Sequence, residues 1–219
     1  MDGTIVDNMA FHTAAWIEFF RRRGTDIDVH AFFLRTAGRL SREIMRDYVR
    51  PDLTDTECDA LSDEKESIYQ ELYAPHLCTV PGFDALVAQA KARGIALAVA
   101  TAAPDGNVAF TLDGLALREN FQVVVSAADV ARGKPEPDAF LKAAEGCDVP
   151  PGQCVVFEDS PLGVQAAQRA GMRTVALTTT VPAAAFAGFD NVIAIVENFT
   201  QVSIDSLFGN TGGTLEKCA

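Results

Sequence analysis

Short apolar runs alternate with segments of helical spacing from about residue 80 onward. The runs expected to form strands cover residues 95–101, 123–126, 154–158, 174–178 and 192–196. The segments expected to form helices between them cover residues 83–93, 107–115, 137–145 and 160–170. This alternation is typical of a parallel sheet with helices on both faces, and it predicts a Rossmann-like α/β fold.

Residues 9–79 follow a different pattern, in which apolar side chains recur at helical spacing and no strand-like run appears. The apolar positions are Phe11, Ala14, Ala15, Phe19, Ile44, Tyr48, Leu61, Ile68 and Leu72. The pattern predicts a helical insertion packed as a small bundle, and Pro81-Gly82 marks the return to the sheet. We therefore expect an α/β core domain, residues 1–8 and 80–219, and an inserted helical domain, residues 9–79.

The clearest helix start lies at Ser160. Its hydroxyl can accept from free backbone amides, and Pro161 suits the first helical position because no amide partner exists there. Gly171 suits the turn that closes the same helix.

The charge balance of the 219 residues is acidic, with 18 Lys and Arg against 30 Asp and Glu and a net charge of −12. Proteins that bind nucleic acids or anionic membrane surfaces rely on basic patches. The composition therefore argues against nucleic acid and membrane as partners. We expect a monomer.

The five cysteines are odd in number and form no C-x-x-C pair, which argues against a disulfide framework or a zinc site. They are Cys58, Cys78, Cys147, Cys154 and Cys218. Acidic residues within the first 30 positions argue against a signal peptide, and no run of 18 apolar residues could span a bilayer. These features predict a cytoplasmic protein.

Polar residues follow several of the expected strands, at Thr101, Ser126 and Glu158-Asp159. In open α/β sheets, ligands bind beyond the carboxyl ends of the strands, so these residues are expected to converge on one rim. The hydroxyl of Thr101 and the backbone that follows it, from Ala102, could hold phosphate oxygens. Lys134 could supply positive charge, and the carboxylates could hold Mg²⁺, so the set suits phosphoryl transfer.

Four ordered motifs carry a family resemblance across most of the chain. They are Asp2-Gly3-Thr4, Thr101 after the apolar run 95–100, Lys134 in Gly133-Lys134-Pro135, and Glu158-Asp159 before Ser160-Pro161. The chain resembles the haloacid dehalogenase superfamily of phosphatases and phosphomutases. The resemblance implies that Asp2 is the general acid and base, with Thr101 and Lys134 as further catalytic residues.

The resemblance also implies a metal site and a substrate class. Mg²⁺ would be held by the backbone carbonyl of Asp2 and the side chain of Asp159, with Glu158 beside them. An aspartate at the position of Asp2 argues against dehalogenases, which act on carbon. Small phosphorylated metabolites are therefore the expected substrates.

The family's first motif contains two aspartates separated by one residue, and Met1 stands at the position between them. The nucleophile would then be the residue before Met1, at the end of a central strand. Without that strand its neighbours would keep unpaired backbone groups, and the domain is expected to be weakly stable. We expect that the sequence starts late. The alternatives are an inactive relative that binds a phosphorylated ligand or a partner protein, and a substitute nucleophile such as Asp7.

The resemblance implies that the insertion is a cap that closes over the site. His12, in a His-x-x-Ala-Trp pattern similar to the β-phosphoglucomutase subgroup, would link closure to Asp2, although a half-buried packing role is the alternative. Further candidates for substrate contact are Gly38, Arg39, Arg42, Lys65 and Ala102, with surface charge as the alternative for the basic residues.

The loop that begins Thr101-Ala102-Ala103-Pro104 departs from the Ser-x-Ser-Lys type associated with the mutase. It favours a sugar-phosphate phosphatase over β-phosphoglucomutase, which stays the second hypothesis. A catalytically inactive binding protein is the hypothesis from another class.

Overall fold

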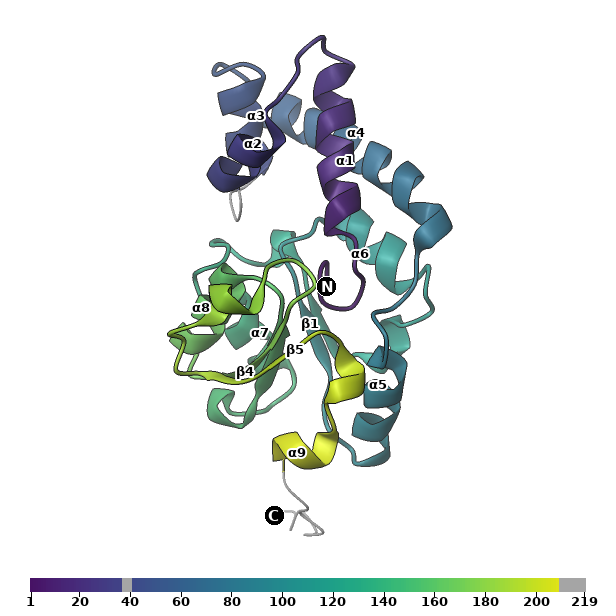
Figure 1. Cartoon of the computed structure of the whole chain (residues 1–219), viewed down its shortest axis with the longest axis vertical. Coiled ribbons are helices and arrows are strands. Elements are labelled where there is room, and N and C mark those ends of the chain that lie inside the picture. Colours follow the sequence, from purple (N-terminus) through teal and green to yellow (C-terminus); the bar gives the residue numbers. More distant parts are fainter. Residues whose placement is uncertain (37–40, 209–219) are drawn as a thin grey trace.

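The structure is a computed structural model that describes residues 1–36 and 41–208. Four helices occupy one end of the molecule, and the strands with their covering helices occupy the other (Figure 1). The four helices are α1 (Met9–Arg21), α2 (Val29–Thr36), α3 (Ser41–Tyr48) and α4 (Asp55–Tyr73). The described part of residues 9–79 contains these four helices and one 3₁₀ turn, and no strand.

Aromatic side chains hold the helical end together. Trp16 and Phe20 of α1 stack with ring centroids 5.8 Å apart, and Phe32 of α2 lies 5.3 Å from Trp16. Helix α4 begins with a capping box, in which Thr54 and Glu57 each accept from the other's backbone amide. The cap fixes where the longest helix starts, and the rings fix how α1 meets α2.

The α/β part contains five strands and, in its described residues, five α-helices. The strands are β1 (Ala98–Ala100), β2 (Val123–Val125), β3 (Val155–Glu158), β4 (Arg173–Leu177) and β5 (Val192–Val196). The helices are α5 (Phe83–Ala92), α6 (Asp105–Leu112), α7 (Asp138–Gly146), α8 (Pro161–Arg169) and α9 (Ile204–Phe208). Short 3₁₀ turns cover Ala74–His76, Arg118–Asn120, Ala127–Asp129, Pro151–Gln153, Ala183–Phe186 and Phe199–Gln201.

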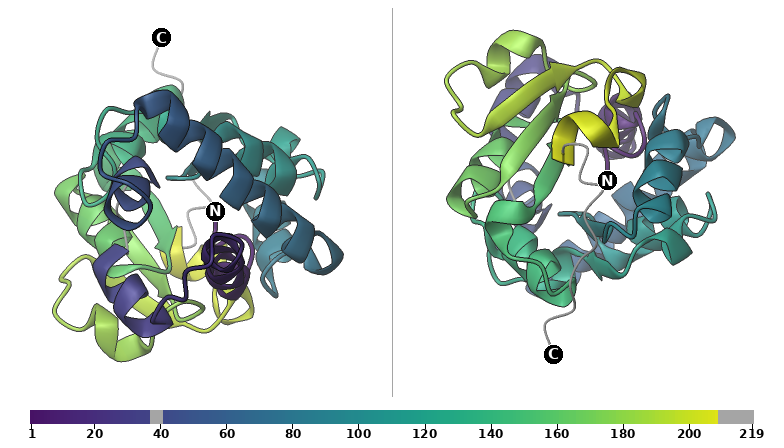
Figure 2. Two further views of the ribbon diagram at one scale, coloured as in Figure 1. Left: turned by 90° about the horizontal axis from the view of Figure 1, so that it is seen from above. Right: turned by 90° about the horizontal axis from the view of Figure 1, so that it is seen from below.

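The strands form two parallel sheets within the described residues. One sheet has the order β1-β2 and the other has the order β3-β4-β5. All pairings are parallel, which confirms the expected α/β class. The expectation of one sheet is not met, because β1 and β3 each pair with a single strand. The N-terminus lies near the middle of the molecule in both views of Figure 2.

The described strand β1 is much shorter than its apolar run. The run predicts a strand over residues 95–101, whereas β1 covers only Ala98–Ala100. A strand is defined by its ladder, and β1 has a ladder to β2 on one side only. The prediction for residues 192–196 is confirmed in full by β5.

Local signals set the helix ends next to the sheet. The hydroxyl of Ser160 accepts from the Gly163 amide at 3.1 Å, and Pro161 is the first residue of α8. Gly171 has a φ of +73°, which closes the helix in a conformation that glycine adopts without strain. In the described residues, no helix combines the length and apolar character that crossing a membrane requires.

Candidate active site

Residues 1–8 form a tight turn at the rim of the sheets. The carbonyl of Met1 accepts from the amide of Ile5 at 2.7 Å, and the Gly3 amide donates to Asn8 Oδ1 at 3.0 Å. Gly3 has a φ of +64°, and a Cβ there would lie 2.1 Å from Asp159 Oδ2. Only glycine allows the turn to approach this carboxylate so closely.

Asp2 is held by the residues that follow the turn. Asn8 Nδ2 donates to Asp2 Oδ1 at 2.6 Å, and Nε2 of His12 lies 3.7 Å from the same oxygen. Burial alone would raise the pKa of Asp2, but hydrogen bonding and charge from His12 outweigh it and lower the pKa. These contacts favour the ionised form of the Asp2 carboxylate.

His12 lies between Asp2 and helix α4. Its ring stacks on Tyr69 with centroids 3.8 Å apart, and its Nδ1 lies 2.9 Å from Nζ of Lys65. The other ring nitrogen, Nε2, faces Asp2. Lys65 is buried, which lowers its pKa, and Glu66 holds it at 3.0 Å. The structure therefore brings together His12, Lys65 and Asp2.

Lys134 and Glu158 form a largely buried ion pair at the end of β3. Lys134 Nζ donates to Glu158 Oε2 at 2.7 Å, and the hydroxyl of Ser160 donates to Glu158 Oε1 at 2.7 Å. Burial would raise the pKa of Glu158, but attraction to Lys134 outweighs it and the pKa is lowered. The ion pair therefore favours the ionised form of Glu158.

Asp159 lies beside the Gly3 turn. Its two carboxylate oxygens accept from the hydroxyls of Thr4 at 2.9 Å and Thr180 at 2.5 Å. Burial, and then the charge of Glu158, raise the pKa of Asp159. Both partners are uncharged hydroxyls. Among the described side chains the Asp159 carboxylate therefore has no cationic partner at hydrogen-bond distance, and it could bind a metal cation.

The backbone turn at Gly3 links these residues. A Cβ on Gly3 would lie 2.1 Å from Asp159 Oδ2, the Thr4 hydroxyl donates to Asp159, and Lys134 pairs with the neighbouring Glu158. The structure therefore brings the Asp2-Gly3-Thr4 turn, Lys134, Glu158 and Asp159 together at the end of β3.

A model of the haloacid dehalogenase-like hydrolase family, a family of hydrolases, matches residues 1–171. The chain belongs to this family. The predictions of family and of enzyme class are confirmed.

Named relatives of this haloacid dehalogenase-like hydrolase include phosphatases. It is 33% identical over 202 residues to validoxylamine A 7′-phosphate phosphatase of Streptomyces hygroscopicus subsp. limoneus, covering 92% of each chain. It is 34% identical over 175 residues to fructose-1-phosphate phosphatase of Escherichia coli, covering 80% of this chain and 92% of that one. The crystal structure of CbbY from Rhodobacter sphaeroides in complex with phosphate superposes with a TM-score of 0.78, at 28% identity, over 94% of this chain and 96% of that one. Phosphatase chemistry is thus supported at the level of the family.

Thr101 follows β1 in this hydrolase and is buried. Its hydroxyl accepts from the Ala103 amide at 3.1 Å, and its own amide donates to the Val125 carbonyl at 2.9 Å. The hydroxyl therefore closes a local turn, and Ala102, between the two, is exposed.

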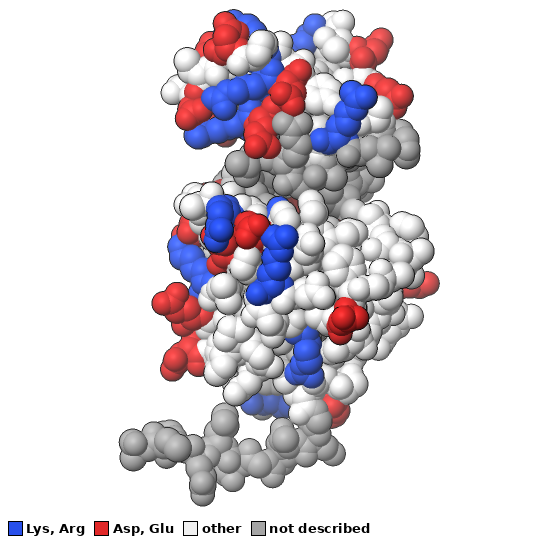
Figure 3. Space-filling model, turned by 90° about the vertical axis from the view of Figure 1, so that its left-hand side faces the viewer, with Lys and Arg blue, Asp and Glu red and all other residues white. Residues whose placement is uncertain are grey.

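The basic residues expected to contact substrate from the cap do not all reach the site. Nε and Nη2 of Arg42 donate to the Asp59 carboxylate at 2.7 and 2.6 Å, so Arg42 is paired within the helical end. Figure 3 shows basic and acidic side chains interleaved over that end. Gly38 and Arg39 lie outside the described residues.

The side chains at the site could supply some, but not all, of the ligands that Mg²⁺ needs. Asp159 and Glu158 supply buried carboxylate oxygens, the ligand type that Mg²⁺ prefers. No group of three or more His, Cys, Asp and Glu side chains in the described ranges is arranged to hold a metal. Backbone oxygens, such as the Asp2 carbonyl, would have to complete the ligand set.

Sequence reasoning missed several residues that position the site. Thr4 and Thr180 bind Asp159, and Asn8 holds Asp2 while its Nδ2 also lies 2.6 Å from the Tyr69 hydroxyl. Asn8 is fully buried although it directly precedes α1, where a cap residue is ordinarily exposed. In the sequence, the signal for Asn8 was a polar residue six positions after Asp2, whereas Thr180 is far away in sequence and offered none.

Proposed function

We propose that this chain hydrolyses the phosphate monoester of a small metabolite, a sugar phosphate, with Mg²⁺ as cofactor and through an aspartyl-phosphate intermediate. One observation carries this function: the Asp2-Gly3-Thr4 turn packs directly against Asp159, next to the largely buried Lys134–Glu158 ion pair. The named phosphatase relatives support the same substrate class.

The nucleophile in this proposal is an aspartate joined to the nitrogen of Met1. A residue attached there would adjoin the Asp2-Gly3-Thr4 turn, which packs against Asp159. Its carboxylate would be two positions before Asp2, on the same tight turn. Asp7 is a poorer candidate because it is exposed and follows the turn.

In the first step a carboxylate oxygen of the nucleophile attacks phosphorus, and the ester P–O bond breaks. Asp2 gives a proton to the departing alcohol oxygen. Asp2 must hold this proton when the substrate is bound, and an anionic phosphate group beside it would favour the protonated form. In the second step the Asp2 carboxylate removes a proton from water, the water attacks phosphorus, and inorganic phosphate leaves the regenerated carboxylate.

Three features would offset the negative charge of the phosphoryl group: Lys134, a metal ion held by Asp159, and backbone amides. Lys134 supplies positive charge that Glu158 holds in place. Mg²⁺, held by Asp159 and the Asp2 carbonyl with Glu158 beside them, would offset the repulsion between the anionic substrate and the carboxylates. Ala102 and its neighbours offer backbone amides to phosphate oxygens at the end of β1.

The proposed division of the chain is an α/β core, residues 1–8 and 80–219, and a cap, residues 9–79. The stack of His12 on Tyr69 and the bond to Lys65 support a role for His12 in linking the cap to Asp2. Arg42 would contact a substrate only after leaving Asp59, and Gly38 and Arg39 stay proposed as substrate contacts. Closing the cap would exclude water from the intermediate.

The test is phosphate release from a panel of sugar phosphates with Mg²⁺. Two forms are compared: the chain as given, and an Asp-extended chain that carries five apolar residues and an aspartate before Met1. We expect release only from the Asp-extended chain, and a loss of at least ~100-fold in that chain with Asp2→Asn.

Three results would contradict this function. Conversion of glucose 1-phosphate to glucose 6-phosphate, dependent on a glucose bisphosphate, would favour the mutase hypothesis. Binding of sugar phosphates without turnover by the Asp-extended chain would favour an inactive binding protein. Full activity of the chain as given would place the nucleophile elsewhere.

A further inference from the structure

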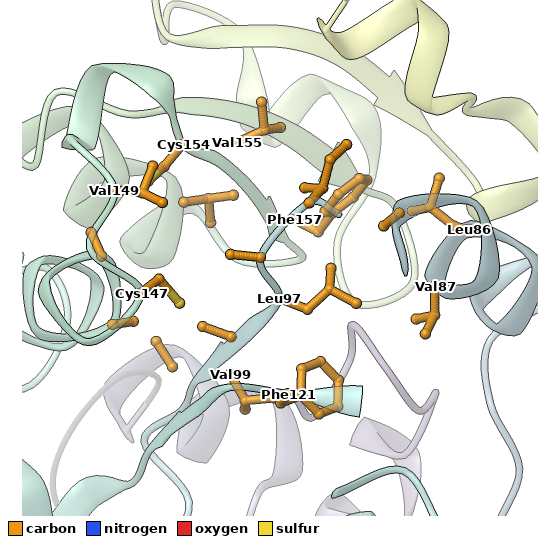
Figure 4. A pocket seen from close by; sticks show the side chains of 18 of the residues that line it. Leu86, Val87, Leu97, Val99, Phe121, Cys147, Val149, Cys154, Val155 and Phe157 are labelled. Atoms are coloured by element: carbon orange, nitrogen blue, oxygen red, sulfur yellow. The ribbon is translucent and has the colours of Figure 1, made fainter. Parts of the chain in front are cut away.

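Two cavities differ in the chemistry of their walls. A cavity of about 260 Å³ lies between the two sheets, and its walls are mainly apolar, with side chains such as Leu97 and Phe157 (Figure 4). Such walls offer few groups that could orient a phosphorylated ligand. A second cavity, of about 210 Å³, lies where α4 of the cap meets α6 of the core, and polar side chains line it, among them Glu66, Gln70 and Asn107. The contact between α4 and α6 therefore joins the cap to the core through polar groups.

Asn107 holds this junction from the core side. Its buried side chain donates from Nδ2 to Glu66 Oε2 and accepts at Oδ1 from Gln70 Nε2, both at 2.8 Å. Helix α6 begins at Asp105, directly after the loop 101–104 whose backbone is proposed to bind phosphate oxygens. A side chain that fixes α6 against α4 therefore also fixes this loop relative to the cap.

Glu66 has a second set of contacts, within the cap. Its Oε1 lies 3.0 Å from Lys65 Nζ, and the same ammonium lies 2.9 Å from His12 Nδ1. Nε2 of His12 in turn lies 3.7 Å from Asp2 Oδ1. The Glu66 carboxylate therefore contacts the residues that lead to Asp2 through one oxygen and the core helix through the other.

The Lys65 ammonium is surrounded by protein groups. The Lys65 side chain is only 4% exposed, and its Nζ lies 5.2 Å from the centre of the Trp16 ring and 5.7 Å from that of Tyr69. Burial lowers the pKa of Lys65, and the charge of Glu66 opposes that change. Glu66 thus favours the charged form of a lysine that is held between the rings and His12.

We propose that Glu66 is a positioning residue that joins the two sides of the candidate active site, holding Lys65 against His12 with one carboxylate oxygen and α6 with the other. The inference rests on the proposed function, in which Asp2 transfers the proton. Lys65 then acts on Asp2 through His12 and does not contact the substrate. Because both contacts come from one side chain, the position of α6 and the orientation of Asp2 depend on each other.

The first test is a double-mutant cycle in the Asp-extended chain. Asn107→Ala should lower kcat/KM ~10-fold, and Glu66→Ala, which also loses the Lys65 contact, ~100-fold. The double variant should resemble Glu66→Ala, because the bond between the two side chains is then already lost. Glu66→Gln keeps an oxygen that can accept from Asn107 but removes the charge next to Lys65, so it should lower kcat with little change in KM.

The matched control for this cycle is Asp63→Asn. Asp63 lies on the same helix and lines the same polar cavity, but it is exposed. The substitution removes one negative charge from the cavity and leaves the contacts of Glu66 in place. It should change neither kcat nor KM.

Trp16 supplies a measurement that does not depend on turnover, made on the chain as given without substrate. It is the single tryptophan of the sequence, and the Lys65 ammonium lies near its ring. Its fluorescence should change with pH as Lys65 loses its proton, and Lys65→Met should abolish that transition. The charged and titratable groups that act on Lys65 are His12 of α1, Glu66 of α4 and Asp2 of the turn. In Glu66→Gln the transition should move ~1–2 units to lower pH, and in Asp63→Asn it should stay in place.

Three results would overturn the positioning role. They are additive losses in the cycle, a Trp16 transition that Lys65→Met leaves unchanged, and equal effects of Glu66→Gln and Asp63→Asn. The proposed function fails separately. An Asp-extended chain that releases no phosphate would contradict the activity, whereas a shifted Trp16 transition in Glu66→Gln would still support the contacts of Glu66.

Discussion

Lys134 Nζ lies 2.7 Å from Glu158 Oε2, and the Glu158 side chain is only 5% exposed. Burying one charge without the other is costly, because the remaining ion has lost its water and its partner. We expect Lys134→Ala to lower the free energy of unfolding by ~3–5 kcal/mol. Adding Glu158→Gln should recover part of that loss, and urea unfolding of the four chains measures the coupling.

The control for this cycle is Lys142→Ala, which removes a pair with Asp129 in which the lysine side chain is 47% exposed. Exposed pairs contribute little to stability, so this change should leave unfolding almost unchanged. Equal losses for the two lysine substitutions would show that the burial of Glu158 has no energetic consequence.

The strands and covering helices were predictable because their signals are local. β5 follows a run of β-branched and apolar residues, and α8 follows Ser160 and Pro161, which cap and start it. Such signals act over a few residues and need no tertiary partner. The types of the site residues, Asp2, Lys134 and Asp159, were readable for the same reason, through short motifs.

The partners of those residues were not predictable from local signals. Thr4 reaches Asp159 across 155 positions, and the Thr180 bond depends on how the loop after β4 passes the Gly3 turn. The motif that contains Thr101 suggests a phosphate contact, but it did not indicate that the same hydroxyl also accepts from the Ala103 amide. Hydroxyl direction depends on backbone packing, which a motif does not encode.

Gly3 is expected to tolerate no side chain. Gly3→Ala would place a methyl group 2.1 Å from Asp159 Oδ2 at a φ of +64°. Gly24 is the control: its φ is +70°, and nothing lies within 4 Å of an added Cβ. Gly24→Ala therefore measures only the cost of placing alanine in a left-handed backbone conformation. Gly24→Ala should cost ~1 kcal/mol and Gly3→Ala clearly more, measured by urea unfolding. A smaller loss for Gly3→Ala than for Gly24→Ala would contradict the close approach.

Asn107 of α6 connects the core to the cap. Its side chain donates to Glu66 Oε2 and accepts from Gln70 Nε2, both at 2.8 Å, and it is 1% exposed. Because Glu66 also holds Lys65, Asn107→Ala should loosen the cap and lower kcat/KM of the Asp-extended chain by ~10-fold. Asp105→Ala, in the exposed first turn of the same helix, is the control and should change kcat/KM little. Unchanged kinetics for Asn107→Ala would show that cap position does not depend on this contact.

The Arg23–Glu64 pair joins the end of α1 to α4 and should make the cap sensitive to acid. The hydrogen bonds from Arg23 lower the pKa of Glu64. The folded pKa lies below the unfolded value of about 4.3, so the pair's contribution is present above that pH and is lost as pH falls through the folded pKa. Glu64 is 41% exposed, so Glu64→Gln should lower the unfolding temperature by only ~1–3 °C at pH 7.

The difference between Glu64→Gln and the parent chain should shrink from pH 7 to pH 3, since the parent loses the same charge as pH falls through the folded pKa of Glu64. Glu71→Gln, an exposed glutamate of α4, is the control and should track the parent chain at both pH values. A constant difference at pH 7 and pH 3 would assign the effect to packing instead.

Two substitutions at His12 can separate ring packing from hydrogen bonding. The ring stacks on Tyr69, while its Nε2 faces Asp2. His12→Phe keeps a ring on Tyr69 and removes the donor, whereas His12→Gln keeps an amide donor and removes the ring. If the donor orients Asp2 for proton transfer, His12→Phe should lower kcat of the Asp-extended chain by ~10–100-fold and His12→Gln by less. A larger loss of kcat for His12→Gln than for His12→Phe would mean that His12 acts by packing. Its role would then be to hold the buried side chain of Lys65.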